Sequence, residues 1–134
     1  MLTFCLPGTI PTIFNGQEIG SRKRLSLFDT AHIEWQWDDD QRQWHDFMKA
    51  LIHTRTENEA LIDGNARFIE AEDNLLAFYR QKVDDKILVI INLSEKISKY
   101  IIPSETTLLK ILGNATQIDR EITLKGYQFY IGKL

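Results

Sequence analysis

The sequence predicts a mainly β protein, in which an antiparallel β-sandwich-like domain follows one strand–loop–helix unit. Apolar residues recur at helical spacing up to about residue 55, whereas from residue 66 they fall into short runs with a period of two. Turn-forming pairs such as Asp84-Asp85 separate these runs, as expected of short strands joined by turns. We therefore expect two parts, residues 1–63 and residues 64–134.

Length and composition exclude several classes of protein. The chain has 134 residues and a formal charge of −3, which is enough for a buried core but too short for a complete (β/α)8 barrel of about 200 residues or more. No basic run extends beyond Arg22–Arg24, so we expect no nucleic-acid partner. A single cysteine, Cys5, excludes a disulfide framework. No apolar stretch of about 18 residues and no signal peptide are visible, so we expect no membrane contact and, by default, a cytoplasmic location.

The N-terminal third offers two short elements. Residues 1–6 have the composition of the last turn of a helix, with a short strand as the alternative. Residues 9–15 form an apolar run between Pro7-Gly8 and Gly16, which is typical of a buried strand flanked by turns.

A helix begins after Asp38, because three consecutive aspartates offer an N-cap oxygen and negative charge in the first turn. Asn58 can end it. Its apolar residues recur at i, i+3, i+4, i+7 and i+8 and predict one face that packs on the core: Trp44, Phe47, Met48, Leu51 and Ile52.

Short β-rich runs follow the helix, and alternate residues of the first two should form the inner faces of paired strands. The predicted strands are residues 75–81, 87–93, 99–102, 108–112, 121–124 and 128–131. The predicted inward side chains are Leu76, Phe78, Ile87, Val89, Ile91 and Leu93.

Three segments together resemble the α-amylase superfamily, glycoside hydrolase family 13. Residues 7–20 resemble the family's string Pro-Gly-x-Pro-x-x-(Tyr/Phe)-x-Gly-(Gln/Asp)-Glu-x-Gly, which forms the eighth barrel strand and the loop after it. Residues 51–61 resemble the end of the last barrel helix, Leu-Ile-x-x-Arg-x-x-Asn-x-Ala-Leu. Residues 76–80, a strand ending in Arg80, and residues 88–94, which end in Asn-Leu-Ser, are similar to the family's C-terminal β domain.

This resemblance implies that residues 1–63 are the end of a catalytic (β/α)8 barrel and that residues 64–134 are a C-terminal β domain. The parent enzyme would act on α-glucans such as starch or maltodextrin through two carboxylates, by a retaining mechanism. The resemblance places these two carboxylates and a third, an Asp, on barrel strands four, five and seven, so we expect no catalytic residue, no cofactor and no activity in this chain alone. Its partner would be the rest of the barrel, and hydrolase and transferase remain open.

The candidate site residues are few. In the parent enzyme, Gly16, Gln17 and Glu18 could line the substrate cleft; alternatively, Glu18 ties down its loop through backbone N–H groups and basic neighbours. Trp35 and Trp37 alternate with polar residues and could stack on sugar rings, or simply pack.

No metal site is expected, because His45 and His53 lie two helical turns apart, about 12 Å along the axis. Two further functions stay open: a free-standing β-sandwich module that binds glucan, and a homo-oligomer that pairs through the exposed strand at residues 9–16.

Overall fold

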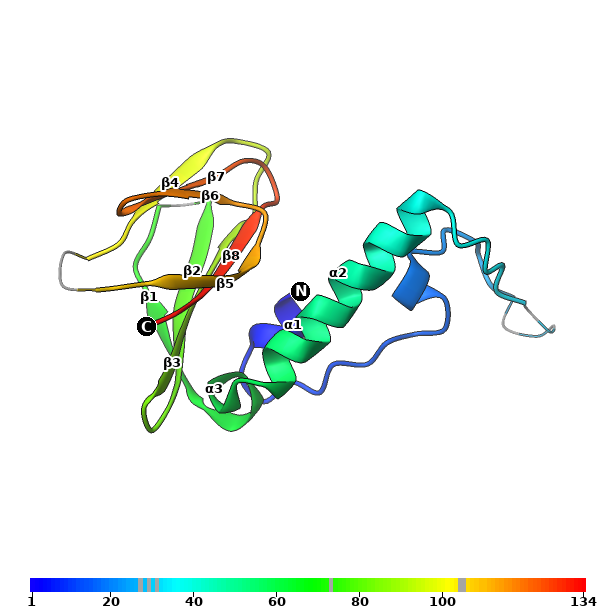
Figure 1. Ribbon diagram of the computed structural model, residues 1–134, viewed down its shortest axis with the longest axis horizontal. Coiled ribbons are helices and arrows are strands. Elements are labelled where there is room, and N and C mark those ends of the chain that lie inside the picture. Colours follow the sequence, from blue (N-terminus) through cyan, green and yellow to red (C-terminus); the bar gives the residue numbers. More distant parts are fainter. Residues whose placement is uncertain (27, 29, 31, 73, 104–105) are drawn as a thin grey trace.

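The computed structural model describes every residue except 27, 29, 31, 73, 104 and 105. Figure 1 shows two layers of strands, with the long helix α2 extending away from them. The helices are α1 (Leu2–Cys5), the 3-10 turn η1 (Gln17–Ile19), α2 (Asp39–Thr56) and α3 (Glu59–Asp63). The strands are β1 (Asn65–Ile69), β2 (Leu75–Lys82), β3 (Asp85–Asn92), β4 (Ser98–Ile101), β5 (Leu109–Gly113), β6 (Thr116–Ile118), β7 (Glu121–Leu124) and β8 (Phe129–Lys133).

All the strand pairs among the described residues are antiparallel. A five-stranded sheet has the order β1-β2-β3-β8-β5, and a three-stranded sheet has the order β4-β7-β6. The predicted fold class, mainly β with an antiparallel β domain after the helix, is confirmed. The strands β1 and β6 were not predicted, because both are short: β1 alternates polar and apolar residues only from Asn65 to Phe68, and β6 has three residues.

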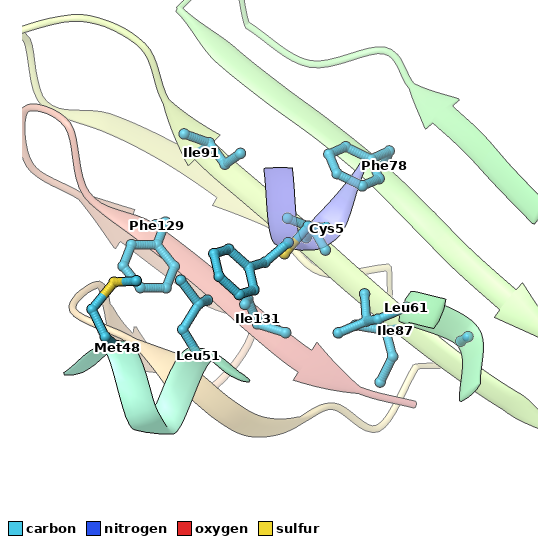
Figure 2. Close-up of a cluster of buried hydrophobic side chains, with 12 residues drawn as sticks. Cys5, Met48, Leu51, Leu61, Phe78, Ile87, Ile91, Phe129 and Ile131 are labelled. Atoms are coloured by element: carbon cyan, nitrogen blue, oxygen red, sulfur yellow. The ribbon is translucent and has the colours of Figure 1, made fainter. Parts of the chain in front are cut away.

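The middle strands of the five-stranded sheet are buried on both faces, whereas the edge strands β1 and β5 are partly exposed. One face packs on the helices through Phe78, Ile87, Val89 and Ile91, and the other packs on the three-stranded sheet through a second cluster that includes Leu88 and Ile90. Figure 2 shows Met48 and Leu51 of α2 against Phe129 and Ile131 of β8. The apolar run 87–91 is therefore continuous because both faces of β3 are covered.

The predicted inner face is confirmed for most of its residues, but the prediction that Leu93 points inward is wrong. Phe78, Ile87, Val89 and Ile91 belong to the helix-side core and Leu76 packs against it, whereas Leu93 is 53% exposed. The reason is that β3 ends at Asn92, so the strand's alternation does not reach residue 93.

Helix α2 begins and packs as predicted. The Asp38 carboxylate accepts a hydrogen bond from the Gln41 N–H (2.8 Å), and the helix ends two residues before Asn58. Met48 and Leu51 are buried and Phe47 packs beside them. Residues 2–5 form a short helix, as the favoured interpretation of the N-terminus predicted.

The predicted strand at residues 9–15 does not form. These residues are irregular and pair with no strand of the described chain, and Ile10 and Phe14 are 90% and 66% exposed. A buried strand needs a hydrogen-bonded neighbour on each side, and none of the described strands lies beside this run. The run is apolar, but no described part of this chain buries Ile10 or Phe14.

Two arginines, which we call the arginine clasp, join the N-terminal segment to the helix and sheet. Arg80 on β2 is fully buried and donates to the carbonyls of Cys5 (2.6 Å) and Gly64 (2.8 Å). Arg55 on α2 donates to the carbonyls of Phe4 (2.7 Å) and Thr9 (2.9 Å). Burial, and then the neighbouring positive charge of Arg55, lower the pKa of Arg80.

Asn92 explains the Asn-Leu-Ser sequence at the end of β3. Its side-chain amide donates to the carbonyls of Lys96 (2.6 Å) and Lys125 (3.1 Å), and its Oδ1 accepts from the backbone N–H of Ser94 (3.0 Å). This buried side chain therefore holds together the loops that follow β3 and β7.

Candidate functional site

A tight turn with a glycine at each end follows the exposed run. Gly16 (φ 88°) and Gly20 (φ 63°) flank η1, both in the left-handed region, and the Gly16 carbonyl accepts from the N–H of Ser21 (2.9 Å). Space is also short, since a Cβ on Gly16 would lie 2.9 Å from the Ile33 side chain. The turn therefore requires glycine at both positions.

Trp44 of α2 fixes this turn to the helix. Its indole N–H donates to the carbonyl of Gln17, and a Cβ on Gly20 would lie only 2.9 Å from the Trp44 ring. Trp44 is nevertheless 41% exposed, so the first residue of the predicted core stripe lies at its edge and not within it.

Glu18 projects from the turn with one oxygen enclosed. Its Oε2 atom is buried and has no hydrogen-bond partner within the described residues. That oxygen does not make the predicted tie to backbone N–H or basic groups. The three residues Gly16, Gln17 and Glu18 stay a predicted cleft loop of the parent enzyme.

An open cleft of about 850 Å³ lies between this turn, residues 34–41, the first half of α2 and the β domain. Aromatic rings lie along its α2 and β8 side: the centroids of Trp44 and Phe47 are 5.6 Å apart, and Phe47 meets Phe129 of β8 edge-on at 6.0 Å. We call Trp44, Phe47 and Phe129 the aromatic row. Asn114 closes the cleft from the β5–β6 turn and accepts the Phe129 N–H (3.0 Å).

Charges of both signs line the rest of the cleft. Lys23 from the loop and Glu34 from the facing segment form an ion pair with a Nζ–Oε1 distance of 2.9 Å. The hydrogen bond from Lys23 lowers the pKa of Glu34. Arg22, Asp38 and Asp40 complete the charged lining, so neither sign dominates.

The structure brings the rings of Trp35 and Trp37 together. Their ring centroids are 5.5 Å apart, and Trp37 also meets His45 edge-on at 5.3 Å. Gln41 holds this segment by accepting the N–H groups of Gln36 and Trp37. Both rings are exposed, and neither is among the described residues that line the cleft. Their sugar-stacking role stays a prediction.

Sequence reasoning missed the cleft itself. Trp44 and Phe47 carry the spacing of a core stripe, and no local signal places Phe129 or Asn114 beside them. Only the packing of α2 on β8 brings these residues together.

Other chemistry is limited in the described chain. Among the residues outside the six undescribed positions, no group of three or more His, Cys, Asp and Glu side chains could hold a metal ion. Burial raises the pKa of the Cys5 thiol to about 11. The described helices include none that combines the length and apolar character needed to span a membrane.

Comparison with known proteins agrees with this fold. Residues 75–131 match the family described as the alpha-amylase SusG C-terminal domain. The chain is 30% identical over 96 residues to alpha-amylase 2 of Dictyoglomus thermophilum, covering 65% of this chain and 17% of that protein. It is 32% identical over 104 residues to the maltogenic alpha-amylase of Bacillus acidopullulyticus, covering 75% of this chain and 17% of that protein.

Solved structures show the same architecture. A crystal structure of an isomaltulose synthase from Erwinia rhapontici NX5 superposes with a TM-score of 0.58 and 26% identity, covering 68% of this chain and 18% of that one. An α-glucosyl transfer enzyme superposes with a TM-score of 0.60 at 19% identity, covering 67% of this chain and 17% of that one. The chain thus spans about a sixth of the length of these relatives.

The β domain with its preceding helix therefore defines a protein of the α-amylase family, to which this chain belongs. Within that family the chain corresponds to the C-terminal part, and its β2–β8 region corresponds to the SusG-type C-terminal domain.

Proposed function

We propose that the chain is the C-terminal part of an enzyme acting on α-glucans and that it completes the catalytic barrel without supplying catalytic residues. The carrying observation is the exposed apolar run, in which Ile10, Ile13 and Phe14 face solvent directly before the ordered turn at Gly16–Gly20. Large apolar groups gathered beside a fixed turn favour burial against another part of the protein. In our proposal this part is the rest of the barrel.

The arginine clasp supports a structural role for the β domain. It holds the carbonyls of Phe4, Cys5 and Thr9, so it fixes the chain just before the exposed run. We propose that residues 64–134 hold residues 1–63 in place and that the turn at Gly16, Gln17 and Glu18 faces the substrate cleft of the whole enzyme. The change from helices to strands at Gly64 supports this division.

The relatives bear on the reaction class. Two are named alpha-amylases, and the solved structures include an isomaltulose synthase and an α-glucosyl transfer enzyme. Their shared chemistry favours transfer of an α-glucosyl group, to water or to another sugar. Retaining hydrolysis needs two carboxylates about 5 to 5.5 Å apart beside the sugar. In our proposal these carboxylates belong to earlier strands of the barrel, outside this chain. We therefore expect the purified chain to release no reducing sugar from starch, and release above a buffer control would overturn the proposal.

A chimaera tests the structural part. This chain would replace the corresponding C-terminal portion of the Dictyoglomus thermophilum alpha-amylase 2, with and without the double change Ile10→Asp and Phe14→Asp. The matched control is Ile97→Asp, since Ile97 is 65% exposed and lies in the loop between β3 and β4. In the isolated chain all these changes should leave the melting temperature nearly unchanged. In the chimaera, the double change alone should lower the melting temperature and the starch-hydrolysing activity. Equal behaviour of the double change and the control would contradict burial of the exposed run.

Self-association is the second candidate, favoured by the same exposed run. Without a barrel, Ile10 and Phe14 could bury themselves against a second copy of the chain. Light scattering should then give a mass above 15.6 kDa that returns to the monomer value in the Ile10→Asp, Phe14→Asp variant. A monomeric mass for the unchanged chain would exclude this candidate.

A further inference from the structure

We propose that the cleft beside the aromatic row binds a neutral oligosaccharide, and that this ligand is an α-linked glucan. The assignment to an α-glucan rests on the proposed function, whereas the cleft and its chemistry rest on the geometry alone. The site differs from both places that the sequence suggested, the turn at residues 16–18 and the Trp35–Trp37 pair.

The shape of the cleft suits a ligand larger than an ion or a metabolite fragment. Its volume of about 850 Å³ lies in the upper part of the range that ligand sites occupy. Of the aromatic row, Trp44 and Phe47 keep surface at the cleft, whereas Phe129 of β8 is 8% exposed and meets Phe47 edge-on. A sugar ring presents a face of C–H groups that packs on such rings, and Trp44 keeps 41% of its surface exposed for it.

The charges of the cleft select against ionic ligands. An anion would meet Glu34, Asp38 and Asp40, and a cation would meet Arg22 and Lys23. A neutral polyhydroxyl compound can donate to the carboxylates and accept from the cations at the same time. The uncharged side chains Gln43 and Asn114 add amide groups of both kinds.

The cleft is also fixed before any ligand arrives. The Trp44 N–H is held by the Gln17 carbonyl, the Asn114 side chain by the Phe129 N–H, and residues 34–37 by Gln41. Binding therefore orders few side chains, which favours a measurable affinity for a weak ligand.

Tryptophan fluorescence tests the proposal, because the chain has three tryptophans and the two outside the cleft can be removed. In the double variant Trp35→Phe, Trp37→Phe, Trp44 is the only tryptophan. Titration with maltoheptaose should change its emission with a saturable curve in the millimolar range. Gln43→Arg, made in the same background, places a bulky side chain on the cleft wall at an exposed position and should weaken binding tenfold or more.

The reciprocal variant, Trp44→Phe, keeps Trp35 and Trp37 as reporters and should show no change in emission. Circular dichroism confirms that each variant is folded. No saturable response of Trp44 at roughly 20 mM maltoheptaose, twenty times a 1 mM Kd, would overturn the proposal. So would a response in the Trp44→Phe variant that disappears in the double variant, since the Trp35–Trp37 pair would then be the site.

A second ligand separates this inference from the proposed function. Cellohexaose has the same monomer in β linkage and should bind at least tenfold more weakly than maltoheptaose. Equal binding of the two would overturn the α-glucan assignment, whereas the chimaera experiment would still decide whether the chain completes a barrel.

Discussion

Replacing Arg80 by methionine tests the arginine clasp. The change removes a fully buried guanidinium and leaves two buried acceptors, the carbonyls of Cys5 and Gly64, without their donors. Each unsatisfied buried carbonyl costs about 1–3 kcal/mol, so the two together cost about 2–6 kcal/mol.

Two effects reduce this cost. The substitution relieves the desolvation that lowers the pKa of Arg80 and the repulsion from Arg55, and it removes the buried Nε atom, which has no hydrogen-bond partner within the described part of the chain. Methionine also keeps much of the apolar stem in place. We therefore expect a net loss of about 2–4 kcal/mol in the free energy of unfolding. For a chain of this size that loss corresponds to a fall of roughly 6–16 °C in the melting temperature.

The assay is urea and thermal unfolding followed by circular dichroism, with hydrogen exchange of the α1 amides alongside. The matched control is Arg67→Met, the same chemical change at an exposed position of β1, which should alter stability by less than about 0.5 kcal/mol. Protection of the Leu6 N–H, which donates to the Leu2 carbonyl, should fall in the Arg80 variant only. If Arg80→Met unfolds at the same urea concentration as the unchanged protein, the hydrogen bonds of Arg80 to the Cys5 and Gly64 carbonyls do not stabilise the fold.

Three further outcomes are expected. Leu51→Ala should destabilise the chain by about 3–5 kcal/mol in urea unfolding, because the Leu51 side chain is buried between α2 and the sheet, whereas Ile97→Ala at an exposed loop position should change stability little; equal effects would refute the packing of α2 on β8. Burial by itself raises the pKa of Asp85, but hydrogen bonds from Lys133 and from the Ala60 N–H outweigh it and hold the folded pKa below 3.8. The resulting stability is present above about pH 4 and is lost as the pH falls through the folded pKa, so Asp85→Asn should melt lower than the unchanged chain at pH 7, and this difference should shrink as the pH falls below about 4; a constant difference would contradict this. The Cys5 thiol, with a pKa of about 11 and no exposure, should resist a disulfide reagent at pH 8 until the chain is unfolded, and rapid labelling of the native protein would contradict its burial.

Local features of the fold could be predicted from the sequence. Asp38 caps α2 because a carboxylate before the first turn accepts a free N–H wherever the helix lies, and the stripe around Met48 and Leu51 follows from the helical period. Gly16 and Gly20 occupy left-handed positions, which glycine adopts without steric cost because it has no Cβ.

Features that depend on distant partners could not be predicted. Residues 9–15 have the composition of a strand, but no described strand lies beside them. Leu93 fits the alternation of apolar residues in β3, but the strand ends one residue earlier, at Asn92. The cleft requires α2 and β8, which are far apart in the sequence, to pack against each other. The resemblance to the α-amylase family supplied what spacing alone did not, namely the identity of the β domain.

The strand order has a consequence for how the β domain is made. β8 is the last strand of the chain, yet it lies inside the five-stranded sheet between β3 and β5. While the chain is being synthesised, β5 has no partner in this sheet until residues 129–133 leave the ribosome, at roughly 5–20 residues per second. Loss of residues 129–133 would leave the sheet divided and would remove side chains from both cores, because Phe129 and Ile131 belong to one core and Tyr130 to the other. The sheet therefore closes only once residues 129–133 are available, and a product that lacks them would be exposed to proteolysis.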